Sequence, residues 1–366
     1  VAISEGNNNR IQIYNRSDLQ YIATAVTFGT DPGYTWNPRD VVFDSSSNLY
    51  IADSYNHRVE LFIKQAGANW TYNRMIGTTN VPYLTDNYHF NNPRVAIDGD
   101  NNLIVIEEKG QRLSKFDENR LLIFSIGTPG IHRDPNRGNN DNEHFNWPHG
   151  VAVDNNGKIY VADNSRVQIY SPSGSYVATI GADWYWGSGD YEFGWVTSLA
   201  VSPTGLIYVS DGPNHRVQIY NSSYTFIGTL GETGVSGSDN SHFNYPMGVE
   251  VDSSGNIFVA DINNCRVQKF DSDNIYQLTF GTCGNYDNQI GNVNAEDVTV
   301  DSLGRVYVAG WMNRVDVFDP DGDYLTTIGG IYGNKTSQFE AASGVAVDKD
   351  GLVFVSDFFN HRIQKF

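Results

Sequence analysis

Short apolar runs bounded by turn residues recur along the whole chain. Residues 151–153, 159–163 and 166–170 are three such runs, rich in Val, Ile and Tyr, and an Asp-Asn-Asn-Gly turn separates the first two. Runs of this length and composition are typical of β-strands. No stretch shows the spacing of a convincing amphipathic helix. The pattern therefore predicts an all-β protein.

The run that begins with Arg occurs eight times. In each copy the Arg is followed by alternating apolar positions and an aromatic residue closes the run. The copies start at Arg10, Arg58, Arg112, Arg166, Arg216, Arg266, Arg314 and Arg362, at intervals of 48 to 54 residues. A period in this range is the signature of a repeat architecture.

Each repeat predicts four strands. A "GVAVD" run such as Val151–Val153 comes first, then an "IYVAD" run, the Arg run, and a "YVATIG" run such as Tyr176–Gly181. Four antiparallel strands per repeat of about 40–50 residues describe one blade of a β-propeller. Packing blades around an axis buries both faces of each sheet and leaves only short edges exposed. We therefore expect residues 1–366 to form a single propeller.

The repeat boundaries predict how the blades divide the chain. Complete repeats cover residues 37–91, 92–146, 147–194, 195–244, 245–292 and 293–340, and residues 1–36 and 341–366 each supply part of a blade. Closure of these two pieces predicts seven blades, with residues 1–14 left over; six and eight blades are the alternatives. Because the chain starts inside a blade and stops after a third strand, we expect it to be a segment of a longer polypeptide or its ordered part.

The loop between the second and third strands carries a repeated motif. Asp53–Arg58, Asp211–Arg216 and Asp357–Arg362 each read Asp-x-x-Asn-His-Arg, and Asp261–Arg266 has Cys in place of His. With the "FN-x-P-x-GVAVD" sequence before the first strand, as at Phe145–Asp154, the motif resembles the NHL-repeat family of β-propellers. The resemblance covers essentially the whole chain. It implies the fold but not one function, since such propellers serve many roles.

The charged residues of this motif are expected to be structural. The Asp that ends the second strand and the Arg that begins the third predict an ion pair or a hydrogen-bonded loop clamp. The pairs are Asp53–Arg58, Asp163–Arg166, Asp211–Arg216, Asp261–Arg266 and Asp357–Arg362. Other repeats depart from the motif: Glu107 and Gln111 stand for Asp and His in one, and Gly310 stands for Asp in another.

The charge of the chain excludes some partners. The net charge is −18, spread along the sequence, and Lys and Arg do not cluster. Phosphate backbones and anionic membranes are bound by clustered basic residues. No apolar run approaches the ~20 residues that span a bilayer. We therefore expect no nucleic-acid partner and no membrane insertion.

Four Asn-x-Ser/Thr sequons predict N-glycosylation, at Asn15, Asn69, Asn221 and Asn334. The first three fall in the turn between the third and fourth strands, and Asn334 falls in a loop between blades. All four places are expected to be exposed. Glycosylation would place the protein outside the cell.

The two cysteines, Cys265 and Cys283, lie in connections that leave one blade on the same face. We expect a disulfide between them, contributing ~3 kcal/mol; two unpaired thiols are the alternative. A disulfide agrees with the sequons on an extracellular location.

The sequence contains no catalytic motif that we recognise. His89, His144 and His242 share one frame, but equivalent positions on different blades are held too far apart to share a zinc ion. His149 is the histidine expected nearest the channel mouth, and it is alone. We assign no catalytic residue, metal ligand or cofactor.

These features favour a secreted, glycosylated, non-enzymatic propeller that binds protein or carbohydrate, or serves as a structural building block of an extracellular assembly through self-association. Exposed aromatic residues near the first strands, including Trp184, Trp186 and Trp195, suit such contacts. The alternative is a metal-dependent lyase or hydrolase with a site at the channel mouth.

Overall fold

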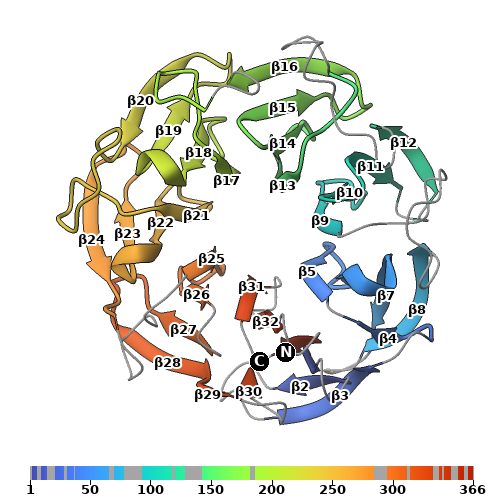
Figure 1. Ribbon diagram of the computed structural model, residues 1–366. Helices are drawn as coiled ribbons and strands as arrows, with labels where there is room; N and C mark the ends of the chain where they lie inside the picture. Colours follow the sequence, from blue (N-terminus) through green and yellow to red (C-terminus); the bar gives the residue numbers. More distant parts are fainter. Residues whose placement is uncertain are drawn as a thin grey trace.

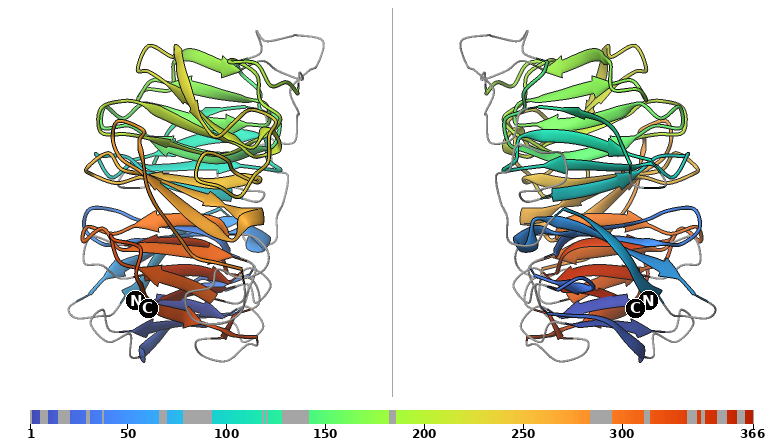
Figure 2. Two further views of the ribbon diagram at one scale, coloured as in Figure 1. Left: turned by 90° about the vertical axis from the view of Figure 1, so that its left-hand side faces the viewer. Right: turned by 90° about the vertical axis from the view of Figure 1, so that its right-hand side faces the viewer.

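The structure of the chain is a computed structural model. The residues described are 2–5, 10–14, 21–28, 31–36, 38–65, 70–77, 93–117, 119, 121–127, 142–181, 186–283, 295–310, 314–332, 338–339, 342–347, 353–357 and 362–365. They form a ring of sheets around a central axis (Figure 1). Seen from the side, the ring is a disc in which the sheets stand one beside the next (Figure 2).

Six sheets have four antiparallel strands each, ordered in the chain from the axis outward (Figure 1). The first three are β5 (Pro38–Phe43), β6 (Leu49–Asp53), β7 (Arg58–Lys64) and β8 (Trp70–Gly77); β9 (Pro93–Ile97), β10 (Leu103–Glu107), β11 (Arg112–Phe116) and β12 (Leu122–Ile126); and β13 (Pro148–Val153), β14 (Ile159–Asp163), β15 (Arg166–Tyr170) and β16 (Tyr176–Gly181). These sheets are the all-β propeller blades that the sequence predicts.

The next three blades continue around the ring. They are β17 (Val196–Val201), β18 (Ile207–Asp211), β19 (Arg216–Tyr220) and β20 (Phe226–Leu230); β21 (Pro246–Val251), β22 (Ile257–Asp261), β23 (Arg266–Phe270) and β24 (Tyr276–Phe280); and β25 (Ala295–Val300), β26 (Val306–Gly310), β27 (Arg314–Phe318) and β28 (Tyr324–Gly329). Short 3₁₀ turns η1 (Ser54–Asn56), η3 (Gly212–Asn214) and η4 (Ile262–Asn264) lie between the second and third strands of three blades.

The described residues form six four-stranded blades, so the predicted count of seven is wrong. The remaining sector holds a seven-stranded sheet, in the order β31 (Ala342–Val347), β32 (Val353–Asp357), β33 (Arg362–Lys365), β1 (Ala2–Glu5), β2 (Arg10–Tyr14), β3 (Tyr21–Phe28) and β4 (Tyr34–Thr35). The physical reason is that β1 pairs with β33, Ile3 opposite Gln364, and also with β2, so β1 and β2 are not left over but join the same sheet. Both chain ends therefore lie side by side (Figures 1 and 2).

The hydrophobic core lies between neighbouring blades. Tyr160 and Val167 of one blade pack with Leu199 and Val209 of the next, and all four side chains are buried. The apolar alternation of each strand thus serves two interfaces, because each sheet turns one face to the preceding blade and one to the following blade. None of the helices in the described part of the chain has the length and apolarity needed to span a bilayer.

Candidate functional site

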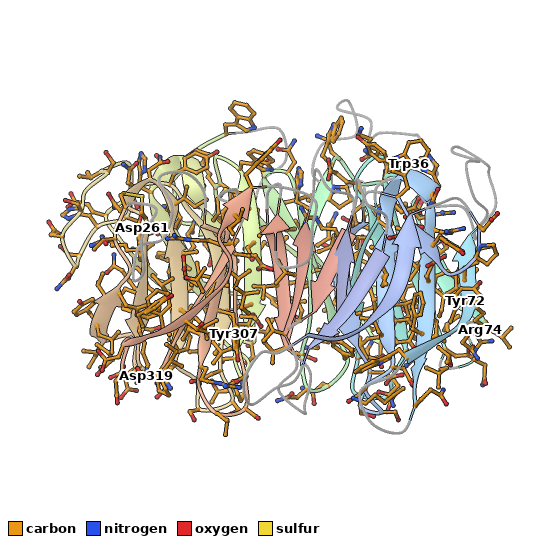
Figure 3. The ribbon with its side chains drawn as sticks, turned by 90° about the horizontal axis from the view of Figure 1, so that it is seen from below. Trp36, Tyr72, Arg74, Asp261, Tyr307 and Asp319 are labelled. Carbon is orange, nitrogen blue, oxygen red and sulfur yellow. A yellow bond between two sulfur atoms is a disulfide. The ribbon has the colours of Figure 1, made fainter. Side chains whose placement is uncertain are left out.

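The connections between strands separate onto two faces of the disc. The loops between second and third strands, and the segments that lead into the next blade, lie on one side, called here the loop face. The hairpin turns lie on the other side, called the turn face. In Figure 3, Trp36 and Asp261 lie toward the loop face and Asp319 lies toward the turn face.

The Asp and Arg of the repeated motif form buried ion pairs on the loop face. Arg Nε lies 2.8 Å from the Asp carboxylate in the pair Asp53–Arg58, 2.7 Å in Asp163–Arg166, 3.0 Å in Asp211–Arg216 and 2.7 Å in Asp261–Arg266. Where the motif departs, Glu107 pairs with Arg112 in the same way, and Arg314 pairs instead with Asp316 at 2.9 Å. Asp357 and Arg362 stand opposite each other in the ladder, and their side chains lie outside the described part.

Each clamp also holds the segment that leads into its own blade. Arg216 donates to the backbone oxygens of Ser188 at 2.9 Å and Glu192 at 2.7 Å, and Arg266 repeats these bonds to Ser238 and His242. An Arg guanidinium has five donors in a fixed fork, which suits it to a site with several acceptors. The pair is therefore a structural clamp that fixes the lead-in segment against its blade.

The Asp of the clamp is satisfied on both oxygens. Gly194 N–H donates to Asp211 Oδ1 at 2.8 Å, and the Asn214 side chain donates to Asp211 Oδ2 at 2.8 Å. Burial raises the pKa of Asp211, and these two hydrogen bonds together with the Arg216 charge oppose the rise. The Asn of the Asn-His-Arg motif thus serves the same clamp.

One clamp contains an additional carboxyl. Arg58 lies between Asp53 and Glu60, 2.9 Å from Glu60 Oε1, where the equivalent residues of other blades are Gln168, Gln218 and Gln268. Burial, with the neighbouring Asp53 charge, raises the pKa of Glu60 well above its usual range. Glu60 therefore holds its proton more readily than an exposed carboxyl does, because one guanidinium cannot balance two buried negative charges.

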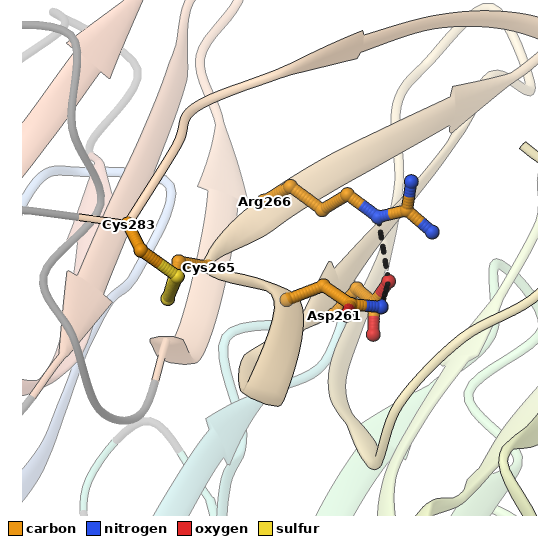
Figure 4. The surroundings of a disulfide bond; sticks show 5 residues. Asp261, Cys265, Arg266 and Cys283 are labelled. Carbon is orange, nitrogen blue, oxygen red and sulfur yellow. Dashed lines mark hydrogen bonds and ion pairs between the residues drawn. A yellow bond between two sulfur atoms is a disulfide. The ribbon is translucent and has the colours of Figure 1, made fainter. Parts of the chain in front are cut away.

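In two blades the residue before the clamp Arg accepts a hydrogen bond from the segment that leads into the next blade. His215 Nδ1 accepts the Tyr245 N–H at 3.1 Å, and Gln111 Oε1 accepts the Trp147 N–H at 2.8 Å. At the equivalent place Cys265 forms a disulfide with Cys283, in the connection toward the following blade (Figure 4). We call this position the blade link; Gln111, His215 and Cys265 occupy it in these three blades.

The remaining histidines are dispersed. His242 lies 2.7 Å from Asp239 and 3.1 Å from Glu232, and its hydrogen bonds to these carboxylates raise its pKa. His149, at the loop-face end of β13, meets the Trp195 ring edge-on at 5.0 Å between centroids. His89 lies outside the described residues. In the described ranges no three His, Cys, Asp or Glu side chains are placed to hold a metal ion.

Glu250 is an ionisable residue of the axial channel that the sequence analysis missed. It lies on the innermost strand β21, opposite Phe258. At the same strand position the other repeats have Val42, Ala96, Ala152, Ala200, Thr299 and Ala346. Aligning the repeats would therefore have shown Glu250 as the one charged residue at a position that is otherwise uncharged. Burial, with the charges of Asp297 and Asp252, raises the pKa of Glu250 to about 8.

Glu250 makes stability depend on pH. Its folded carboxyl holds a proton up to about pH 8, whereas in the unfolded chain it ionises near pH 4.5. Stability is therefore expected to fall as pH rises through this window, by up to about 1.4 kcal/mol per pH unit, and Glu250→Gln should remove that slope. Urea denaturation across the window measures the effect. An unchanged slope in the variant would contradict it, and Asp321→Asn, at an exposed carboxyl, is the control.

The turn face has a cavity of about 510 Å³ on the axis, with walls of Val42, Ile97 and Val153 and a rim that includes Asp44, Asp98 and Asp154. The rim carboxylates are already occupied. Asp44 accepts the N–H groups of Ser46 and Asn48 on one oxygen, and Asn48 Nδ2 and Tyr50 O–H on the other. These aspartates close hairpin turns, as the sequence predicts.

Asn221 is the sequon that falls within the described residues. It begins the turn between β19 and β20, and its Oδ1 accepts the N–H groups of Ser223 at 2.9 Å and Thr225 at 3.0 Å. Ser222 and Ser223 beside it are exposed. Asn15, Asn69 and Asn334 lie outside the described residues.

The repeats match a known family. The family model of the NHL repeat matches residues 35–62, 145–170, 193–220, 243–270 and 339–366. The chain is an NHL-repeat β-propeller. The family model does not match two blades of this NHL-repeat propeller, those of β9–β12 and β25–β28. In these two blades the first Asp of the motif is replaced, by Glu107 in one and by Gly310 in the other.

Solved structures share the overall fold of this NHL-repeat propeller. Virginiamycin B lyase from Staphylococcus aureus is similar with a TM-score of 0.60 at 11% identity, over 89% of this chain and 93% of the lyase. A streptogramin B lyase structure has a TM-score of 0.61 at 12% identity, over 90% of this chain and 92% of the other. At this identity the similarity concerns the fold alone. A search of curated proteins found no match.

Proposed function

We propose that this NHL-repeat propeller is a secreted, glycosylated, non-enzymatic module that binds its ligand on the loop face. The observation that carries the proposal is the exposure of large aromatic residues there: Trp147 is 40% exposed and Trp195 is 36% exposed. Large exposed aromatic side chains are typical of binding surfaces, because they offer apolar area together with a polar edge.

Two further features support an extracellular location. The Cys265–Cys283 disulfide suits an oxidising compartment, since cytosolic thiols are kept reduced. Asn221 lies in a turn whose neighbouring serines are exposed, as glycosylation requires.

The second candidate is a metal-dependent lyase or hydrolase with its site at the channel mouth. One observation favours it: Glu250 has the raised pKa of a carboxyl that could act as an acid at neutral pH, and Asp297 lies near it. The lyases named above support the fold and do not transfer their reaction at 11–12% identity.

The mass of the protein purified from its source tests the proposal. We expect a mass above the 40.7 kDa of the bare chain, falling when N-linked glycans are removed enzymatically. Asn221→Gln expressed in secreting cells should lose one glycan, and Asn256→Gln, an asparagine outside any sequon, should lose none. If the wild-type protein secreted by these cells has the mass of the bare chain, the proposal is contradicted.

A further inference from the structure

Three neighbouring blades carry a large aromatic residue at one repeated position of the loop face. Each is the last residue before the innermost strand: Trp147 before β13, Trp195 before β17 and Tyr245 before β21. The sequence has Asn at the same place before β5, β9 and β25. The fold therefore accepts a small polar residue here, and packing does not require the aromatic ones. We call these three residues the aromatic arc.

Two of the three residues of the aromatic arc, Trp147 and Tyr245, have an unusual backbone conformation. Trp147 has φ +58° and Tyr245 has φ +63°, in the left-handed region that bulky side chains rarely adopt. The blade links Gln111 and His215 fix both residues by accepting their N–H groups. Gly212 leaves room for the Tyr245 ring, since a Cβ there would lie 3.1 Å from it. Strain held in place around exposed side chains is typical of functional sites.

Polar groups stand beside the aromatic rings. The His149 ring meets the Trp195 ring, and His149 Nδ1 lies 3.8 Å from the carboxylate of Glu108, which comes from the preceding blade. Three consecutive blades therefore bring together a carboxylate, an imidazole and exposed indole rings. Flat apolar rings beside groups that can donate and accept hydrogen bonds match the two surfaces of a sugar, its C–H face and its hydroxyl groups.

We propose that the aromatic arc, with His149 and Glu108, binds an uncharged oligosaccharide; this rests on the proposed function of the loop face. The charge of −18 opposes the approach of sulfated or carboxylated glycans. The sugar rings lie on Trp147 and Trp195 and their hydroxyl groups bond to His149, while the buried Glu108 carboxylate orients that imidazole.

Calorimetric titration of the full chain with chitohexaose and cellohexaose tests the proposal. We expect saturable binding of at least one of them, weakened about tenfold in both Trp147→Ala and Trp195→Ala. Tyr332→Ala is the matched control: this residue is 66% exposed and lies in β29 (Ile331–Tyr332), across the ring from β13 and β17 (Figure 1). The melting temperature of both Trp variants should fall only slightly, because the two residues are already 40% and 36% exposed and other blades carry Asn at this place.

Several results would overturn the proposal. One is that neither hexasaccharide shows saturable binding up to about 10 mM, and another is that the wild type and both Trp variants bind equally well. The others are that a heparin hexasaccharide binds more tightly than the two neutral hexasaccharides, or that only decaproline binds. The last result would assign the arc to peptides. Failure here leaves the proposed function standing if the native protein is a secreted glycoprotein, and the native mass decides that separately.

Discussion

Replacing Arg216 with methionine should lower the free energy of unfolding by about 3–5 kcal/mol. Arg216 is 1% exposed, and its guanidinium bonds to Asp211, to Thr233 and to the backbone oxygens of the lead-in segment. Methionine fills much of the volume but supplies no donor. The Asp211 carboxylate is then buried without a balancing charge, and buried carbonyl oxygens lose their partner. Urea denaturation measures the loss.

Two further variants separate the charge from the packing. Asp211→Asn added to Arg216→Met should recover part of the loss, about 1 kcal/mol or more, because it removes the uncompensated charge. Arg305→Met is the matched control. Arg305 also pairs with a buried aspartate, but its side chain is 25% exposed and Asp301 keeps the Tyr307 hydroxyl as a donor, so we expect about 1 kcal/mol. If Arg216→Met lowered the free energy of unfolding by less than this control value, the clamp would not be a source of stability.

The strands and the clamp could be predicted from the sequence because both are local. Alternation of apolar residues fixes the strand faces within five or six residues. Asp261 and Arg266 are charged residues set within apolar runs only five positions apart, so burial requires them to pair. Because the pattern recurs, the same inference applies to each repeat that carries it.

The ring closure and the blade links could not be predicted in this way. Arg10–Tyr14 and Arg362–Phe366 have nearly the same pattern, and nothing local shows that strands from both ends enter one sheet. The bond between His215 and Tyr245 crosses between blades and joins residues 30 positions apart. Glu250 could have been noticed by aligning the repeats, but its raised pKa depends on Asp297 of the neighbouring blade.

Replacing both cysteines by alanine should lower the free energy of unfolding by about 3 kcal/mol, since the disulfide closes a loop whose ends are 18 residues apart. The blade links give this prediction its control. His215→Ala removes a hydrogen bond at the same position of the preceding blade and should cost only about 1 kcal/mol. Dithiothreitol should destabilise the wild type and leave the Cys265→Ala/Cys283→Ala variant unchanged. If instead the cysteine and histidine variants lost equal stability, the covalent link would add nothing to the hydrogen bond it replaces, and Cys265 would be only another side chain that reaches the next blade.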